Sequence, residues 1–486
     1  MTIARTAVKR QRSLNRGRGT PLYRQIYERF RQAISSGQLR PGDRLPSVRD
    51  LARDFATARG TVDAAFAMLA GEGYVVSRGP AGTIVSPELN AGAAMAALTD
   101  RSVAPTTQPQ DRAEPKLLQL GLPALDRFPR KAWTHIVARE ARRISPADMM
   151  YPDPAGLQPL RQAVAAYLAS SRGVACRWQQ VVITGGFQDG LDLALRVLLR
   201  RNDRVWIEDP YFPPVRTALD MAGARLTPVR VDADGMRVAD GIRQARNARI
   251  VVVTPSHQSP LGAALSLPRR LALLDWANKA DAYVVEDDYD SEFRFIGRPL
   301  PALKSLDRDQ RVIYAGSFSK TLFPGLRLGY LVLPDRLLGQ FVEANAARTA
   351  GHSLFEQRIV AAFMADGQFS RHLKHMRKLY AARRAALVDA LETEFGERIR
   401  IELKPGGMHL VVHFTGAVRD VVLAELAKAA GFGAEALSAR TIAHNCGQAL
   451  LVGFTNVAEP DAPDIARRLR RALEPHLPRG ASSRRL

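Results

Sequence analysis

Residues 317–330 read SFSKTLFPGLRLGY, and this stretch decides how the larger part of the 486-residue chain is interpreted. Strand-like runs precede and follow it, so it forms a turn with Gly and Pro between two strands. Ser317, Ser319 and the backbone N–H groups of such a turn suit a phosphate, and Arg327 adds a planar fork for the same anion. Lys320 has apolar neighbours, and a desolvated lysine can lose its proton and form a Schiff base. The stretch therefore predicts a pyridoxal phosphate (PLP) site with Lys320 as the aldimine lysine.

Two motifs further upstream favour this interpretation over an ordinary surface loop. GGFQDG at 185–190 follows a strand-like run and opens a helix expected from about Leu191, and glycines there let backbone N–H groups approach an anion. VVEDDYDSEF at 284–293 stands just ahead of the strand that leads to the first stretch. Asp287 at the end of a buried strand can pair with a protonated pyridine nitrogen, and Tyr289 can hydrogen-bond the ring oxygen. Five acidic residues in seven positions would otherwise indicate a solvated loop.

Length and composition set the broad class of protein. A chain of 486 residues is expected to form two or three domains, and 46% hydrophobic residues suffice for a large core. The sequence contains no run of 18 apolar residues, so no membrane span is expected. The basic N-terminus lacks the apolar region of a secretory signal. Two distant cysteines indicate neither a disulfide framework nor a metal site. We expect a cytoplasmic protein without a bound metal.

Positive charge is concentrated at the N-terminal end. The whole chain has a formal net charge of +22. Residues 1–86 hold 15 Lys and Arg against 6 Asp and Glu, or +9, and the other 400 residues hold 55 against 42, or +13. This asymmetry favours a polyanion as the partner of the N-terminal part, although a generally arginine-rich chain would explain some of the excess.

The N-terminal part has the element pattern of a winged helix-turn-helix. An apolar stripe at helical spacing predicts a first helix from 21 to about 36, and Ser47 can cap a second helix over 48–55. A third helix is expected at 59–70, and two short strands joined by a GPAG turn follow within 74–85.

Composition shifts divide the chain into segments. Beyond the N-terminal module, strand-like runs alternate with helices, which indicates an α/β domain. From about residue 338 a long helical region precedes a smaller α+β lobe. The predicted segments are a basic tail (1–19), the winged helix domain (20–86), a flexible linker (87–115), an α/β effector domain (116–478) and a tail (479–486).

The N-terminal module resembles the DNA-binding domain of the GntR family. The matching stretches are LRPGDRLPSVRDLA at 39–52, RGTV at 59–62 and GEGYV at 71–75. The resemblance implies that the third helix enters the major groove of an operator in double-stranded DNA. Ala58 stands where the family often has Ser or Asn. The implied DNA contacts are Arg59 and Thr61 near base edges, Arg44, Ser47 and Arg49 at the phosphates, and Arg78 on the wing.

The remainder resembles a fold-type I, PLP-dependent aminotransferase, and its fusion behind a GntR-type domain resembles the MocR family of transcriptional regulators. The most specific matches are TPSHQSPLG at 254–262, residues 286–293 and the 317–330 stretch. The resemblance implies that Lys320 forms the internal aldimine. It further implies that Asp287 faces the pyridine nitrogen, Tyr289 meets the ring oxygen, and Ser317, Ser319 and Arg327 bind phosphate with the Gly186, Phe187 and Gln188 backbone.

Departures from the family pattern fall on the side of the site where an effector would bind. The sequence EDPYF at 208–212 makes Phe212 the residue that stacks on the ring, with Tyr211 beside it. Ser259 and Leu261 replace an aromatic residue and a hydroxyl residue that are common in the family. Candidate effector contacts are Arg440, as the arginine nearest to the expected carboxylate clamp, with Tyr211 and His257.

The expected function is transcriptional regulation that uses PLP, free or joined to an amino compound, as the signal. Two alternatives are an active aminotransferase with a DNA-binding appendage and a constitutive DNA-binding protein whose large domain only dimerises. The resemblance implies a homodimer, of a head-to-tail kind, that is associated with the nucleoid when DNA is bound. A γ-amino acid, an aminosulfonate, an α-amino acid and PLP alone all remain open as effectors.

Overall fold

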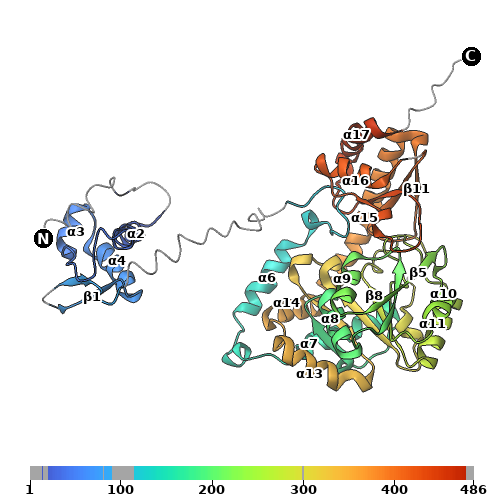
Figure 1. Ribbon diagram of the computed structural model, residues 1–486, viewed down its shortest axis with the longest axis horizontal. Helices are drawn as coiled ribbons and strands as arrows, with labels where there is room; N and C mark the ends of the chain where they lie inside the picture. The colour runs from blue at the N-terminus through green and yellow to red at the C-terminus, as the bar shows by residue number, and fades with distance from the viewer. Residues whose placement is uncertain are drawn as a thin grey trace, which may run out of the picture. The chain divides into compact units, whose positions relative to one another are not determined.

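The computed structural model describes residues 14, 20–79, 82–89, 114–297, 300–416 and 418–477. The chain divides into two compact units, Met1–Ala113 and Glu114–Leu486 (Figure 1). The predicted tails, apart from residue 14, and all but the two ends of the predicted linker lie outside the described residues. The segment boundaries given above therefore stay predictions.

The first unit is a winged helix-turn-helix, as predicted. Its three helices surround a core of its own, in which the rings of Phe30 and Phe66 meet edge to face at 5.5 Å. The hydroxyl of Ser47 accepts a hydrogen bond from the N–H of Asp50 at 3.1 Å, which confirms Ser47 as an N-cap. The elements are α2 (Leu22–Ser35), α3 (Val48–Asp54), α4 (Arg59–Gly71) and the antiparallel strands β1 (Val75–Ser77) and β2 (Thr83–Val85).

The second unit is built on a mixed sheet of eight strands in the order β3-β10-β9-β8-β7-β4-β5-β6. Neighbours from β9 through β5 are parallel, whereas β10 is antiparallel to both of its neighbours and β6 is antiparallel to β5. The strands are β3 (Val181–Thr184), β4 (Arg204–Asp209), β5 (Arg225–Asp232), β6 (Gly235–Met236), β7 (Ile250–Val253), β8 (Tyr283–Asp288), β9 (Val312–Ser317) and β10 (Gly329–Val332).

Helices cover both faces of this sheet because its strands are apolar on both sides. Along β4, Val205 and Ile207 belong to one core, while Trp206 belongs to another and stacks on Trp276 at 3.8 Å. The helices of this large lobe are α6 (Arg130–Ala141), α7 (Gln158–Arg172), α8 (Phe187–Leu198), α9 (Pro213–Met221), α10 (Val238–Ala245), α11 (Leu267–Lys279), α12 (Phe318–Thr321), α13 (Leu338–Thr349) and α14 (Leu354–Ala365).

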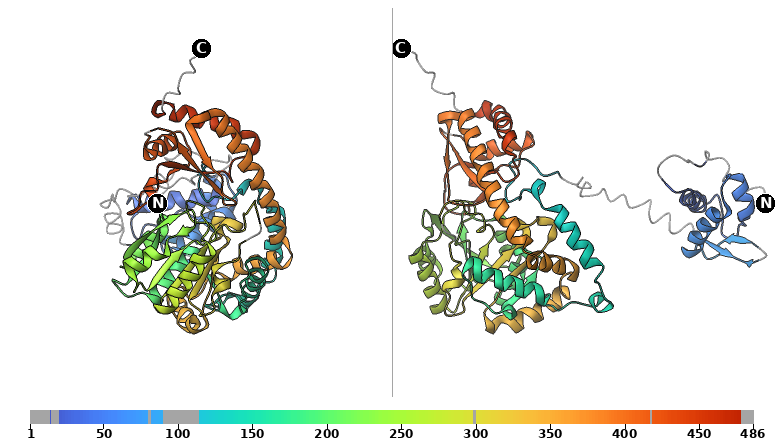
Figure 2. Two further views of the ribbon diagram at one scale, coloured as in Figure 1. Left: turned by 90° about the vertical axis from the view of Figure 1, so that its right-hand side faces the viewer. Right: turned by 180° about the vertical axis from the view of Figure 1, so that it is seen from behind.

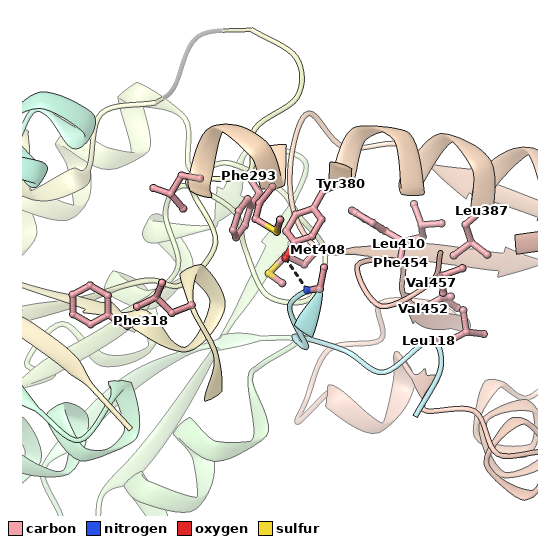
Figure 3. Close-up of a cluster of buried hydrophobic side chains, with 14 of the residues drawn as sticks. Leu118, Phe293, Phe318, Tyr380, Leu387, Met408, Leu410, Val452, Phe454 and Val457 are labelled. Carbon is pink, nitrogen blue, oxygen red and sulfur yellow. Dashed lines mark hydrogen bonds between the residues drawn. The ribbon is translucent and has the colours of Figure 1, made fainter. Parts of the chain in front are cut away.

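A smaller α+β lobe follows, and the long helix α15 lies where it meets the large lobe (Figures 1 and 2). Its antiparallel sheet has the order β11-β12-β14-β13. Figure 3 shows the apolar cluster at this junction, where Tyr380 packs on Phe293 at 4.8 Å and accepts the N–H of Ala124 at 3.0 Å. The elements are α15 (Gln368–Phe395), β11 (Ile399–Glu402), β12 (His409–Phe414), α16 (Asp420–Ala429), β13 (Glu435–Ala436), β14 (Ala449–Gly453) and α17 (Ala462–Leu473).

Two details differ from the expectations. Helix α8 begins at Phe187, four positions before the expected start, so the GGFQDG motif already supplies its first turn. Strand β5 was not expected, because its apolar residues alternate with Arg and Pro. The long helical region expected from about residue 338 is formed by α13, α14 and α15. None of the helices in the described part of the chain is long and apolar enough to cross a membrane.

Candidate functional site

The predicted site residues meet in one cavity of about 290 Å³. It lies beyond the carboxyl ends of the parallel strands β4, β7, β8 and β9, where open α/β sheets bind ligands. Predicted residues on its wall are Phe187, Gln188, Phe212, Asp287, Tyr289, Ser317, Ser319, Lys320, Arg327 and Arg440. Further wall residues are Leu120, Gly121, Pro214, Ser259, Pro260, Pro324, Met408, His409 and Glu435.

Lys320 extends from the single turn of α12 that follows β9. The side chain of Ser317 caps this turn by accepting the N–H of Ser319 at 3.1 Å. The Nζ of Lys320 donates to the carbonyl oxygen of Gly121 at 2.6 Å. Burial lowers the pKa of the Lys320 amine below its usual 10.5, while the nearby Asp287 and Asp290 act in the opposite direction. The result is an amine that loses its proton more readily than an exposed lysine.

Asp287 provides a buried carboxyl group on the cavity wall. It is 5% exposed, and within the described residues it accepts no hydrogen bond. Burial, followed by the charges of Asp288 and Asp290, raises the pKa of Asp287 well above its usual value, and Lys320 opposes this rise. A carboxyl group in this position would be strongly stabilised by a cationic partner inside the cavity.

The acidic stretch around Asp287 is internal rather than a solvated loop. Glu286 accepts the N–H groups of Leu303 and Lys304 at 2.7 and 2.8 Å. The carboxylate of Asp288 accepts from the guanidinium of Arg172 at 2.7 Å and from the hydroxyl of Tyr314 at 2.6 Å. Because β8 is buried along its length and its side chains alternate, only Asp287 of these three faces the cavity.

The hydroxyl of Tyr289 contacts a histidine that is itself bound to a carboxylate. Nδ1 of His257 lies 3.0 Å from the hydroxyl of Tyr289 and 2.9 Å from the carboxylate of Asp290. A β-carbon on Gly407 would lie 2.3 Å from the His257 ring, so the glycine makes room for it. His257 is not among the residues that line this cavity: its ring contacts Tyr289 and faces a second, smaller cavity.

On the side of the cavity where a phosphate is expected, the backbone of Gly186 approaches the guanidinium group of Arg327 closely. Gly186 has φ +109°, and a β-carbon there would lie 3.6 Å from Nη2 of Arg327. A β-carbon on Gly329 would lie 2.8 Å from Cα of Gly186, so only glycine fits at this crossing. Gly186 itself is the N-cap of α8, so the free N–H groups of the first turn lie beside Arg327, Ser317 and Ser319. This arrangement suits a doubly charged anion.

Residues from the small lobe, among them Arg440 and Glu435, close another side of the cavity. Arg440 is 7% exposed, and its Nη2 lies 2.6 Å from the carboxylate of Glu435. Its segment is anchored to the large lobe, because Asp209 accepts three N–H groups at 442–444 and the N–H of Tyr211 donates to the Arg440 carbonyl at 2.8 Å. Tyr211 thus contacts the Arg440 segment through its backbone and is not among the residues that line the cavity, whereas Phe212 does line it.

Sequence reasoning missed Glu435 and His409. Nε2 of His409 lies 2.7 Å from the carbonyl oxygen of Pro260, and burial, followed by the charge of His257, lowers the pKa of His409 to about 4. The neutral ring therefore donates to Pro260 and leaves Nδ1 as an acceptor. Both residues lie in the small lobe, far along the chain from the recognisable motifs. The signal that could have found Glu435 is its position five residues before Arg440.

The predicted DNA contacts lie mostly on the surface of the first unit. Arg44, Ser47, Arg49, Arg59 and Arg78 are exposed, and Thr61 in the first turn of α4 is half-buried. The Arg44 guanidinium lies against the wing, since a β-carbon on Gly82 would be 3.0 Å from its Nε. The Ser47 hydroxyl is occupied by the cap and also donates to the carboxylate of Asp50 at 2.8 Å.

The geometry defines a class of protein: a DNA-binding winged helix joined to an aminotransferase-like α/β unit. Residues 22–85 match the family "Bacterial regulatory proteins, gntR family", and residues 118–443 match "Aminotransferase class I and II". The chain is 36% identical to the probable rhizopine catabolism regulatory protein MocR of Rhizobium meliloti, over 91% of this chain and 92% of that one. It is 32% identical to the pyridoxine biosynthesis transcriptional regulator PdxR of Corynebacterium glutamicum, over 88% and 90% of the two chains.

Solved structures share the fold of the second unit. The kynurenine aminotransferase of Pyrococcus horikoshii, in complex with PMP, has a TM-score of 0.68 and 27% identity, over 75% of this chain and 93% of that one. The α-aminoadipate aminotransferase LysN of Thermus thermophilus, complexed with N-(5'-phosphopyridoxyl)-L-leucine, has a TM-score of 0.67 and 28% identity, over 74% and 92%. The chain therefore belongs to the MocR-type transcriptional regulators, which combine a GntR DNA-binding domain with an aminotransferase domain.

Proposed function

We propose that this regulator holds PLP at Lys320 and changes its DNA binding in response to a small primary amine, or to PLP itself. The observation that carries the proposal is the single cavity that joins the amine of Lys320, the buried carboxyl of Asp287 and the first turn of α8 beside Arg327. When bound, PLP would supply an aldehyde that condenses reversibly with primary amines.

The residues of the cavity fit this cofactor in three places. Ser317, Ser319, Arg327 and the first turn of α8 would hold its phosphate. Asp287 would face the pyridine nitrogen and Tyr289, fixed by His257, would donate to the ring oxygen. Phe212 would lie against the ring, and the backbone of Gly121 leaves room for the lysine amine. Within the described residues no group of His, Cys, Asp and Glu is arranged to hold a metal ion.

An active aminotransferase with a DNA-binding appendage is the second candidate. The relatives that span nearly the whole chain are regulators, whereas an aromatic-amino-acid aminotransferase of Thermococcus litoralis covers 64% of it. Regulation needs only reversible amine exchange at Lys320, whereas turnover also needs proton transfer at carbon and product release. We infer that regulation is the main function, which would place the protein with chromosomal DNA in the cytoplasm.

We further propose that the protein is a homodimer in which each subunit contributes one winged helix to the operator. The second unit exposes Met149, Met150 and Tyr151 at 75%, 70% and 87%, an apolar surface of the kind that a second subunit covers. Sedimentation at micromolar concentration with PLP bound should give a dimer. A monomer under these conditions would refute this part of the proposal.

The cofactor proposal is tested by reduction of the purified protein. Wild type should be yellow, and borohydride should bleach the colour and attach the cofactor to Lys320, as located by mass spectrometry. Lys320→Ala should retain some PLP through the phosphate contacts and lose the covalent attachment. An adduct on any other lysine would show that the site is assigned wrongly.

A further inference from the structure

The first three quarters of α15 carry a concentration of positive charge that the cofactor site does not use. Residues 368–388 hold six Lys and Arg and no Asp or Glu, a net +6 from 21 residues, whereas the 400 residues after position 86 have +13 in total. A general excess of arginine therefore does not explain this segment. Two of the six are engaged inside the unit, because Arg383 pairs with Asp126 and Arg384 lies over the ring of Phe295 at 4.6 Å.

The other four cations and a histidine form one exposed face of the helix. Leu373, Met376 and Tyr380 are buried on the inner side of α15, as their spacing requires. The exposed residues recur at intervals of three and four on the outer side. We call this surface the α15 basic face; its residues are Arg371, Lys374, His375, Arg377 and Lys378, all exposed.

The structure leaves these charges without neutralisation along the helix. No carboxylate stands three or four positions from Arg371, Lys374 or Lys378. The guanidinium groups of Arg371 and Arg377 donate to backbone carbonyls of Asp366 and Glu292 at 2.9 and 2.7 Å, which orients them without cancelling their charge. The side chain of Asp366 is paired with Arg139 instead.

The charged surface continues onto α6. The rings of Phe128, just before α6, and His372 in α15 lie 5.9 Å apart, so the starts of the two helices are adjacent. Arg130, Lys131 and His135 line the open groove between them and are exposed. A partner lying along this surface would meet cations from two elements.

We propose that the α15 basic face binds the phosphate backbone of duplex DNA outside the segment that the winged helix reads. Arg371 and Lys378 are separated by about 10 Å along the helix axis at 1.5 Å per residue. That length covers about three phosphate intervals of one strand at 3.4 Å each. The chain already brings DNA close through its own GntR domain, so even weak contacts act at a high effective concentration. The contribution is independent of base sequence, and it rests on the DNA-binding function proposed above.

The test compares salt dependence in full-length protein. The probe is a fluorescein-labelled duplex of random sequence, about 60 base pairs long, titrated by anisotropy at several salt concentrations. The variant is Lys374→Gln with Lys378→Gln, and the matched control is Arg225→Gln with Arg246→Gln, which removes two exposed charges beside β5 and α10. Each lost phosphate contact should reduce the slope of log K against log salt by about 0.9, so the variant should be shallower by about 1.8 per subunit.

An unchanged control with a shallower variant supports the proposal. Equal changes in both would indicate net charge alone and overturn it, as would an unchanged slope in the variant. If the variant keeps its DNA slope but loses binding to vesicles of phosphatidylserine, the face binds membranes and the proposal is wrong. Wild type that binds no duplex at all would instead refute the proposed DNA-binding function.

Discussion

Gly121 is the residue that leaves space for the reactive amine. Its φ of +64° lies in the left-handed region, and a β-carbon there would be 2.7 Å from Nζ of Lys320. We expect Gly121→Ala to displace the lysine and to slow the uptake of PLP by apoprotein at least tenfold. Gly173→Ala is the matched control, because Gly173 has φ +68° and its β-carbon would meet nothing closer than 3.7 Å. Equal PLP uptake rates in both variants would show that backbone strain, rather than contact with Lys320, governs the effect.

Arg327 and Arg440 are expected to act at different stages. Arg327 lies beside Gly186 and would bind the PLP phosphate whether or not an amine is present. Charged hydrogen bonds contribute roughly 1.5–3 kcal/mol, so Arg327→Ala should weaken PLP binding by about 10- to 150-fold. Arg440 is paired with Glu435, so Arg440→Ala should leave PLP affinity nearly unchanged and alter the response to amines. Titration of each apoprotein variant with PLP tests this. Equal losses of PLP affinity in the two variants would contradict the roles proposed for Arg327 and Arg440.

The lowered pKa of Lys320 predicts the pH dependence of cofactor uptake. The neutral amine is the reactive form, and its fraction rises with pH and reaches one half at the pKa. Since burial lowers the pKa of Lys320 from 10.5, the rate of PLP uptake should rise with pH and level off below pH 10.5. Nα-acetyl-lysine amide, measured with PLP over the same pH range, serves as the exposed reference. A midpoint for the protein at or above that of the reference would contradict the effect of burial.

Two of the three helices of the DNA-binding unit, α3 and α4, differ in their N-terminal caps. Ser47 caps α3, whereas Ala58 at the N-cap of α4 has extended backbone angles and no side-chain bond. A cap contributes about 0.5–2 kcal/mol. Ala58→Ser should therefore slow amide hydrogen exchange in α4 by about 2- to 30-fold in full-length protein, and Ser47→Ala should speed exchange in α3 by a similar factor. No change in α4, alongside the expected change in α3, would show that Ala58 is not a vacant cap position.

Elements whose function resides in contiguous sequence could be predicted, and those assembled from distant segments could not. Lys320 and Arg327 stand in one turn, so their shared cavity followed from the motif. His257 and Tyr211 also stand in motifs, but a motif does not determine which way a ring faces. The ring of His257 packs against Gly407, and that of Tyr211 packs in the hydrophobic core, so neither lines the cavity.

Glu435 lines the cavity, although no motif in the sequence predicted it. It reaches the cavity because Asp209, at the end of β4, binds the backbone at 442–444 and holds the neighbouring segment over the large lobe. This contact joins residues more than 230 positions apart, so no local pattern in the sequence could predict it. The winged helix, by contrast, is built from local elements in order, so its fold could be predicted completely.

In the full-length protein, we propose that amine chemistry at Lys320 controls DNA binding by the GntR domain. DNA binding and the response to amines can be altered separately. Arg59→Ala, on the exposed start of α4, should abolish specific DNA binding and leave PLP uptake intact. Lys320→Ala should keep DNA binding and lose the response to amines. A ligand can shift the DNA-binding equilibrium only by its different affinities for the two states.

The most direct measurement is fluorescence anisotropy of the intergenic DNA beside this protein's own gene, with and without an amine that changes the absorbance of the holoprotein. Wild type should change its DNA affinity when the amine is added, and Lys320→Ala should bind the same DNA with an affinity that the amine leaves unchanged. If Lys320→Ala still responds to the amine as fully as wild type does, the signal does not pass through Lys320, and the proposed control of DNA binding by amine chemistry at this lysine is wrong.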